Sequence, residues 1–169
     1  MPSDRTLVIT AKPSLTWSSP TSATVDNIEY DQGDTQPNMP GLVNPVTGDI
    51  RLGHMPSNPS YSDNVDITIQ LDNTNIVDSA GNHVGGQWAA GNANGMSGNP
   101  PATAYCWFIE NPESNEPIDY TPITVPSMTT SLDGSGNVLI NDDTPDDQPG
   151  VTTTYTFCLG LSVPTAQGR

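Results

Sequence analysis

Alternation of apolar and polar residues along the chain predicts β-strands. The most regular segment is residues 65–72, VDITIQLD, in which every second side chain is aliphatic. Successive side chains of a strand point to opposite faces, so this segment covers a core with one face and meets solvent with the other. That behaviour is typical of antiparallel sheets, because parallel strands are usually buried on both faces. Residues 151–161 repeat the pattern, with an inner face of Tyr155, Phe157, Leu159 and Leu161.

Shorter segments bring the expected total to about seven to nine strands. Residues 104–110, AYCWFIE, are apolar on both faces, which predicts a central strand. Residues 128–132 and 137–141 flank Asp-Gly-Ser-Gly, a strong hairpin signal because glycine adopts positive φ at little cost. The remaining candidates are residues 6–12, 23–30 and 49–54.

The pattern leaves little room for helix. Pro or Gly interrupts every window of a dozen residues with helical spacing, and the chain contains 17 Pro and 15 Gly. The length suits one hydrophobic core, and we find neither an internal repeat nor a second-domain boundary. We therefore predict an all-β protein, with residues 1–169 forming a single antiparallel two-sheet sandwich.

Charge narrows the range of partners. Nineteen acidic residues face four basic ones, giving a formal net charge of −15. A field this negative repels nucleic acid and anionic lipid, so we expect neither as a partner. The first residues lack the apolar core of a signal peptide, which favours a cytoplasmic protein if Met1 is the native start. If Met1 is not native, a periplasmic or secreted origin stays open.

Calcium is the ligand that the sequence favours most, because calcium sites use oxygen ligands from loops. Residues 133–137 resemble the start of an EF-hand loop, but Val138 and Thr144 replace its invariant Gly and bidentate Glu. A hairpin turn explains these residues better. The densest acidic run, NDDTPDD, follows at residues 141–147, and such runs are usually only solvated. The candidate metal ligands are Asp133, Asn137, Asp142 and Asp143.

The residues that most often carry catalysis are few. His54, His83, Cys106 and Cys158 are scattered singly, whereas structural zinc sites present their ligands in close pairs. Neighbouring strands would allow a disulfide between the two cysteines, but the apparent lack of export favours reduced thiols. No nucleophile-elbow motif is present, and we expect no catalytic residues and no cofactor other than calcium.

Two long connections, residues 31–48 and 89–101, are the places to look for a site, because long loops are often functional. Ornamented surface loops are the simpler interpretation. Tryptophan and tyrosine side chains near these loops, such as Trp88, either form a glycan- or protein-binding surface or pack over loop bases.

The C-terminal 65 residues resemble the DP-EP family of small uncharacterised bacterial β-sandwich proteins. The resemblance lies in Asn111-Pro112, Glu116-Pro117, the hairpin DGSGNVLIND, the acidic turn and the closing strand TYTFCLGL. The first dipeptide is Asn-Pro where that family has Asp-Pro. The resemblance implies an immunoglobulin-like sandwich and supplies no catalytic residues.

The sequence therefore predicts an acidic, non-enzymatic binding or structural protein. The alternative is a calcium-dependent or carbohydrate-binding module whose site lies in the long loops. A protein or glycan partner and a homo-oligomer both stay open.

Self-repulsion among the acids leads to a first prediction. Monovalent salt screens surface charges, so the melting temperature should rise as NaCl increases from roughly 10 mM to 0.5 M. Calorimetry at constant pH measures this. A flat melting temperature would show instead that the charges are already dispersed or paired.

Overall fold

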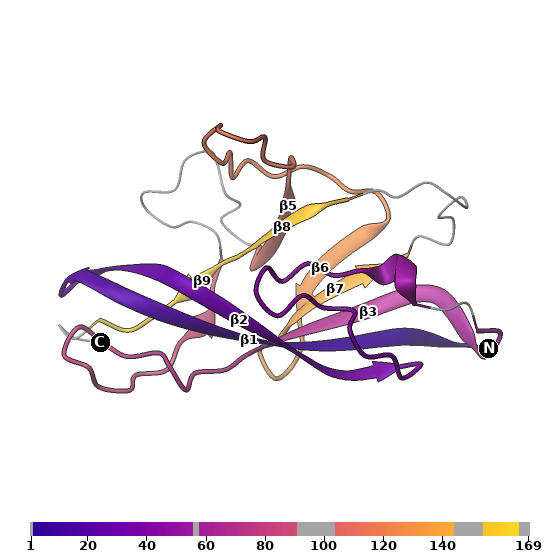
Figure 1. The fold of residues 1–169 in the computed structure, drawn as a ribbon, viewed down its shortest axis with the longest axis horizontal. Coiled ribbons are helices and arrows are strands. Elements are labelled where there is room, and N and C mark those ends of the chain that lie inside the picture. The colour runs from indigo at the N-terminus through magenta and orange to yellow at the C-terminus, as the bar shows by residue number, and fades with distance from the viewer. Residues whose placement is uncertain (1, 56–57, 91–103, 144–153, 166–169) are drawn as a thin grey trace.

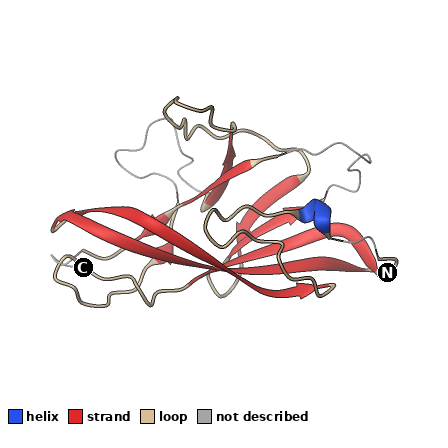
Figure 2. Ribbon diagram, viewed as in Figure 1, coloured by secondary structure: helices blue, strands red, loops and turns tan. Residues whose placement is uncertain are grey.

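Strands dominate the regular structure of this chain (Figures 1 and 2). The computed structural model describes residues 2–55, 58–90, 104–143 and 154–165. These contain nine strands and one 3₁₀ turn, so the all-β class is confirmed. None of the described helical segments is long and apolar enough to span a membrane. The largest sheet has the order β2-β1-β3-β7-β6, built from β1 (Ser3–Ser19), β2 (Ser22–Gln36), β3 (Tyr61–Leu71), β6 (Met128–Leu132) and β7 (Val138–Asp142).

This sheet is mixed, which corrects the expected antiparallel arrangement. β1 pairs antiparallel with β2 but parallel with β3. The register nevertheless aligns apolar residues in rows. Leu7 lies beside Ile67 and Ile67 beside Ile140, and one row along, Ile9, Ile69 and Val138 are aligned in the same way. All of these side chains are at most 4% exposed, so the core face of the sheet is continuous across three strands.

The connection from β2 to β3 packs onto this core face. Leu42, Val43 and Met55, from residues 37–60, are buried within the same hydrophobic cluster. The strand expected at residues 49–54 is wrong. Ile50 forms only an isolated bridge with Val43, and the chain then turns through the 3₁₀ segment η1 (Leu52–His54). The Met55 N–H donates to the Leu52 carbonyl at 2.9 Å, which bends the chain away from the extended path.

Two short sheets cover the other side of the core (Figure 1). One pairs β5 (Cys106–Ile109) with β8 (Thr156–Leu159), and the other pairs β4 (Gln87–Trp88) with β9 (Leu161–Ser162). All four residues of β5 are buried, in keeping with their apolar character, but β5 is not the central strand that was expected, because its sheet has only two strands among the described residues. Among the described residues the two short sheets are separate. The described structure is therefore all-β but not a clear two-sheet, immunoglobulin-like sandwich.

The closing strand breaks at Gly160, where the two short sheets meet. The Gly160 N–H donates to the Tyr105 carbonyl at 3.0 Å, and its own carbonyl accepts from the Ala89 N–H at 2.7 Å. A Cβ atom on Gly160 would lie 2.0 Å from the Ala89 carbonyl oxygen. Only glycine allows the two backbones to approach this closely. Phe157 and Leu159 on one side of the break, and Leu161 on the other, pack against the core.

This close approach yields a second prediction. Gly160→Ala should lower the free energy of unfolding by about 1–3 kcal/mol, because the methyl group forces the buried Gly160 backbone away from the Ala89 carbonyl. Gly134→Ala is the matched control, since no atom lies within 4 Å of the added Cβ. Urea denaturation of both variants measures the difference. Equal stability of the two variants would contradict the proposed close contact.

Candidate functional site

The structure divides the predicted metal ligands between the two ends of β7. Asp133 and Asn137 lie together in the β6–β7 turn, whereas Asp142 ends the strand beside Met128 and Val65. Asn137 and Asp142 are five residues apart along the strand, which spans roughly 16 Å, whereas calcium–oxygen distances are roughly 2.3–2.6 Å. One ion cannot bridge both ends. No group of three acidic, His or Cys residues suited to a metal occurs among the described residues, and Asp146 and Asp147 lie outside them.

The Asp133 carboxylate holds the turn together. Its Oδ1 accepts from the backbone N–H groups of Ser135 and Asn137 at 2.8 and 2.9 Å, and its Oδ2 accepts from the Asn137 side chain at 2.9 Å. Hydrogen bonds from Asn137, the side-chain one first, lower the pKa of Asp133. Gly136 supplies the positive φ of 82° that closes the turn.

A second turn, at residues 78–82, repeats this arrangement. Asp78 Oδ1 accepts from the N–H groups of Ala80 and Asn82 at 2.8 and 2.9 Å, and the Asn82 side chain donates to Oδ2 at 3.2 Å. Gly81 has φ 84°, matching Gly136. The backbone hydrogen bond from Asn82 is the main cause of the lowered pKa of Asp78. In both segments, DSAGN and DGSGN, the carboxylate therefore stabilises a turn, and this includes the Asp133 oxygens that suggested calcium.

The two histidines and two cysteines do not form a common site among the described residues. His54 ends η1, and His83 forms a bridge with Val77. Cys106 lies opposite Leu159 while Cys158 lies opposite Trp107, so the two thiols point to opposite faces of the β5–β8 pair. Both cysteines are free, as favoured from the sequence. Burial raises the pKa of Cys106 to about 12 and that of Cys158 to about 11, so both thiols stay protonated and unreactive at neutral pH.

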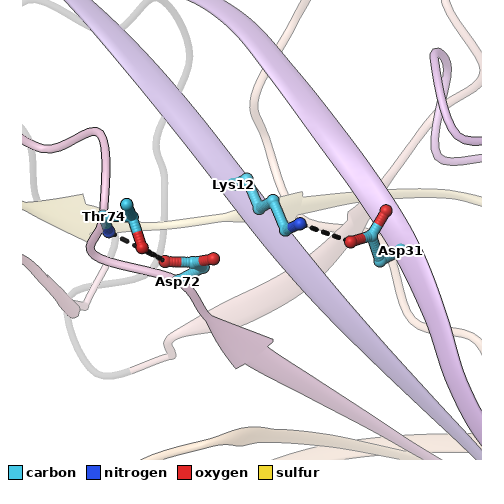
Figure 3. Close-up of polar contacts among 4 residues, drawn as sticks. All are labelled: Lys12, Asp31, Asp72 and Thr74. Atoms are coloured by element: carbon cyan, nitrogen blue, oxygen red, sulfur yellow. Dashed lines mark hydrogen bonds and ion pairs between the residues drawn. The ribbon is translucent and has the colours of Figure 1, made fainter.

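The single lysine takes part in a surface ion pair. Lys12 Nζ contacts the Asp31 carboxylate across the β1–β2 pair (Figure 3). The hydrogen bond to Asp31, together with its charge, raises the pKa of Lys12, whereas a Schiff-base lysine needs a lowered one. Nearby, Asp72 accepts from the N–H and hydroxyl of Thr74, which lower the pKa of Asp72 (Figure 3).

The indole N–H groups of all three tryptophans donate hydrogen bonds to backbone carbonyls of this chain. The indole N–H of Trp17 donates to the Val77 carbonyl at 2.7 Å. Trp88 donates to the Ile69 carbonyl at 3.2 Å, and Trp107 to the Tyr120 carbonyl at 3.0 Å. Each ring therefore holds a loop or strand in place. Tyr155, expected in the core, is 38% exposed and meets the Phe108 ring edge-on at 6.5 Å.

The two long connections predicted at residues 31–48 and 89–101 differ in how much of each the structure describes. Residues 31–36 belong to β2, and a stretch of the same connection covers the outer edge of that strand. The Tyr30 N–H donates to the Pro45 carbonyl at 3.0 Å, and Gln32 Oε1 accepts from the N–H of Leu42 at 2.7 Å. Residues 91–101 of the other loop lie outside the described residues.

Among the described residues, no segment pairs with the outer edge of β2 from Ala23 to Ile28. Tyr30 lies opposite Ala11 of β1, and Ile28 lies opposite Pro13. Because backbone groups of an antiparallel strand point alternately toward and away from the neighbour, the N–H and C=O of Ile28 point away from β1, as those of Tyr30 do. Pro13 has no N–H to pair with Ile28, in keeping with this geometry. A bulge at Asp26 shifts the alternation by one residue, so that the backbone N–H and C=O of Val25 also point away from β1. Within the described part of the chain, no backbone hydrogen bond joins this edge to another segment.

A shallow groove of about 390 Å³ runs along this open edge. Val46 is 74% exposed and Val25 is 46% exposed, which makes them the two most exposed large hydrophobic side chains in the described residues. Burial raises the pKa of Tyr30, whose hydroxyl therefore stays neutral. The sequence pattern does not reveal this site, because the strand order decides which edge of the sheet is open. The groove is lined by Val25, Asp26, Asn27, Ile28, Tyr30, Val46 and Thr47.

Comparisons with known proteins found no match to this chain among family models, curated proteins or solved structures.

The two matching turns lead to a third prediction. A carboxyl group whose pKa is lowered by folding adds stability above its unfolded pKa near 4, and that stability is lost as pH falls through the folded pKa. The double variant Asp78→Asn/Asp133→Asn should therefore melt at a lower temperature than the wild type at pH 7. The difference should narrow below about pH 4.

Asp34→Asn is the control, because it removes an acid from an exposed position of β2. It should leave the melting temperature at pH 7 unchanged or raised. Thermal melts at pH 2.5, 4 and 7 make the comparison. A gap that stays constant over this range would show that the carboxylate charges do not stabilise the turns.

Proposed function

We propose that this chain is a non-enzymatic binding protein that holds another polypeptide at the open edge of β2. The observation that carries the proposal is the coincidence of outward-facing backbone groups with two exposed valines, Val25 and Val46. Unpaired strand edges template pairing with another chain, and native proteins usually cover or blunt them. Here residues 39–45 cover one half of the edge and leave the other half open.

Calcium and carbohydrate binding receive less support. The carboxylates of Asp133 and Asp78 already accept hydrogen bonds from their own turns. The three indole N–H groups donate to backbone carbonyls. The resemblance to the DP-EP family also offers no catalytic role, which is consistent with a binding or structural function.

A random peptide library displayed on phage tests this proposal. Selected peptides should bind the double variant Val25→Asn/Val46→Asn at least about tenfold more weakly than the wild type, because a polar groove loses its apolar contacts. Ile118→Asn is the matched control, since Ile118 is 42% exposed and lies outside the groove. Its dissociation constants should equal those of the wild type.

Peptides that bind both variants like the wild type would contradict the proposed surface. A library that yields no binder would contradict polypeptide binding altogether. In that case, a saturable thermal shift with calcium that magnesium does not reproduce, or a positive glycan array, would support the alternative module.

A further inference from the structure

The open edge of β2 has the size and geometry of a docking site for one extended segment. Residues 23–28 span roughly 20 Å of strand, enough for about six residues of a partner. The chain already pairs with this edge at the adjacent outward-facing position, where the Tyr30 N–H donates to the Pro45 carbonyl. A partner strand would make the same kind of backbone hydrogen bond. A peptide that continues from this point along Ile28 and Val25 would add a strand to the sheet.

Side chains along the edge alternate in character. Val25, Ile28 and Tyr30 face the core side of the sheet, because their β1 partners Leu15, Pro13 and Ala11 share one face. The bulge at Asp26 keeps Val25 on this face. The opposite face of β2 presents Asn27 and the acids Glu29 and Asp31. A strand beside this edge would therefore meet apolar groups on one face and acidic groups on the other.

The negative charge of β2 favours a basic partner segment. β2 carries four acids, Asp26, Glu29, Asp31 and Asp34, and no basic residue. Its ion pair to Lys12 engages only Asp31 among the described residues. A second copy of this chain is a poor occupant, since each copy has a net charge of −15 and a β2–β2 pair would bring like charges together. A basic segment would instead be attracted by the field of the whole protein.

From these observations we propose that the open edge binds a cationic peptide in extended conformation, with alternating apolar and basic residues, as an added strand. This inference rests on the proposed function and names the ligand class of the same site. Backbone hydrogen bonds supply the affinity, while the groove beside Val25 and Val46 selects apolar side chains on one face.

The test uses the full chain and a capped six-residue peptide of alternating valine and lysine. Isothermal titration should give saturable binding that weakens as NaCl increases from roughly 50 mM to 0.5 M. The peptide with glutamate in place of lysine should bind at least about tenfold more weakly. Val25→Pro, which removes an outward N–H, should lose binding, whereas Val25→Ala should keep most of it.

Two N-methylated peptides test strand addition independently of any protein variant. Methylation of the valine amides blocks one edge of the peptide, and methylation of the lysine amides blocks the other. Binding should survive in one peptide and disappear in the other, because only one edge pairs with β2.

Each contrary outcome has a distinct meaning. If library peptides depend on the groove but lysine and glutamate peptides bind equally, or if both N-methylated peptides bind, the cationic strand is wrong and the binding function stands. If no peptide depends on Val25 and Val46, the proposed function fails as well. Sedimentation that shows a dimer abolished by Val25→Pro would overturn the inference by assigning the edge to a second copy.

Discussion

The parallel register of β1 and β3 organises this molecule, because it aligns Leu7 with Ile67 and Ile9 with Ile69. Antiparallel pairing of β3 with β7 extends the same rows to Ile140 and Val138. β3 occupies one side of β1, so β2 can pair only with the other side and becomes an edge strand. The connection from β2 to β3 then crosses the core face and buries Leu42 and Met55 there. Both the core and the open edge of β2 follow from this arrangement.

Three of the nineteen acids that give the chain its negative charge have clear local structural roles. Asp78 and Asp133 accept the backbone hydrogen bonds of two matching turns, and Asp72 binds Thr74 in the same local manner. Carboxylates favour such positions because they accept several N–H groups without needing a donor. Oxygen-rich sequences of this kind imitate metal-binding loops. The position of the other candidate ligands distinguishes the two cases here, because Asp142 lies at the far end of β7 from Asp133.

Local features were predictable from the sequence and long-range ones were not. Alternation located β3, and the Asp-Gly signal at Asp133 located the β6–β7 hairpin, since both depend on neighbouring residues. The parallel pair was missed because the outer face of β1 and β3 remains partly exposed, so neither strand shows the double burial of ordinary parallel strands. Residues 49–54 were misassigned because Ile50 and Leu52 pack against the core from an isolated bridge and a 3₁₀ turn, which local alternation does not reveal. The groove was invisible since it combines residues from β2 with Val46 in a separate loop.

Pairing β1 in parallel with β3 also has a kinetic consequence. The β1–β2 hairpin closes through a short turn and can form early, whereas β3 reaches β1 only after residues 37–60 have been ordered across the sheet. Non-local pairing of this kind slows folding, because loop-closure entropy is lost before the new contacts form. Until β3 docks, the hairpin would present Leu7 and Ile9 beside an unpaired edge of β1 in every nascent molecule. The net negative charge keeps such intermediates apart, so the acidic composition protects the chain while the inner edge of β1 is still uncovered.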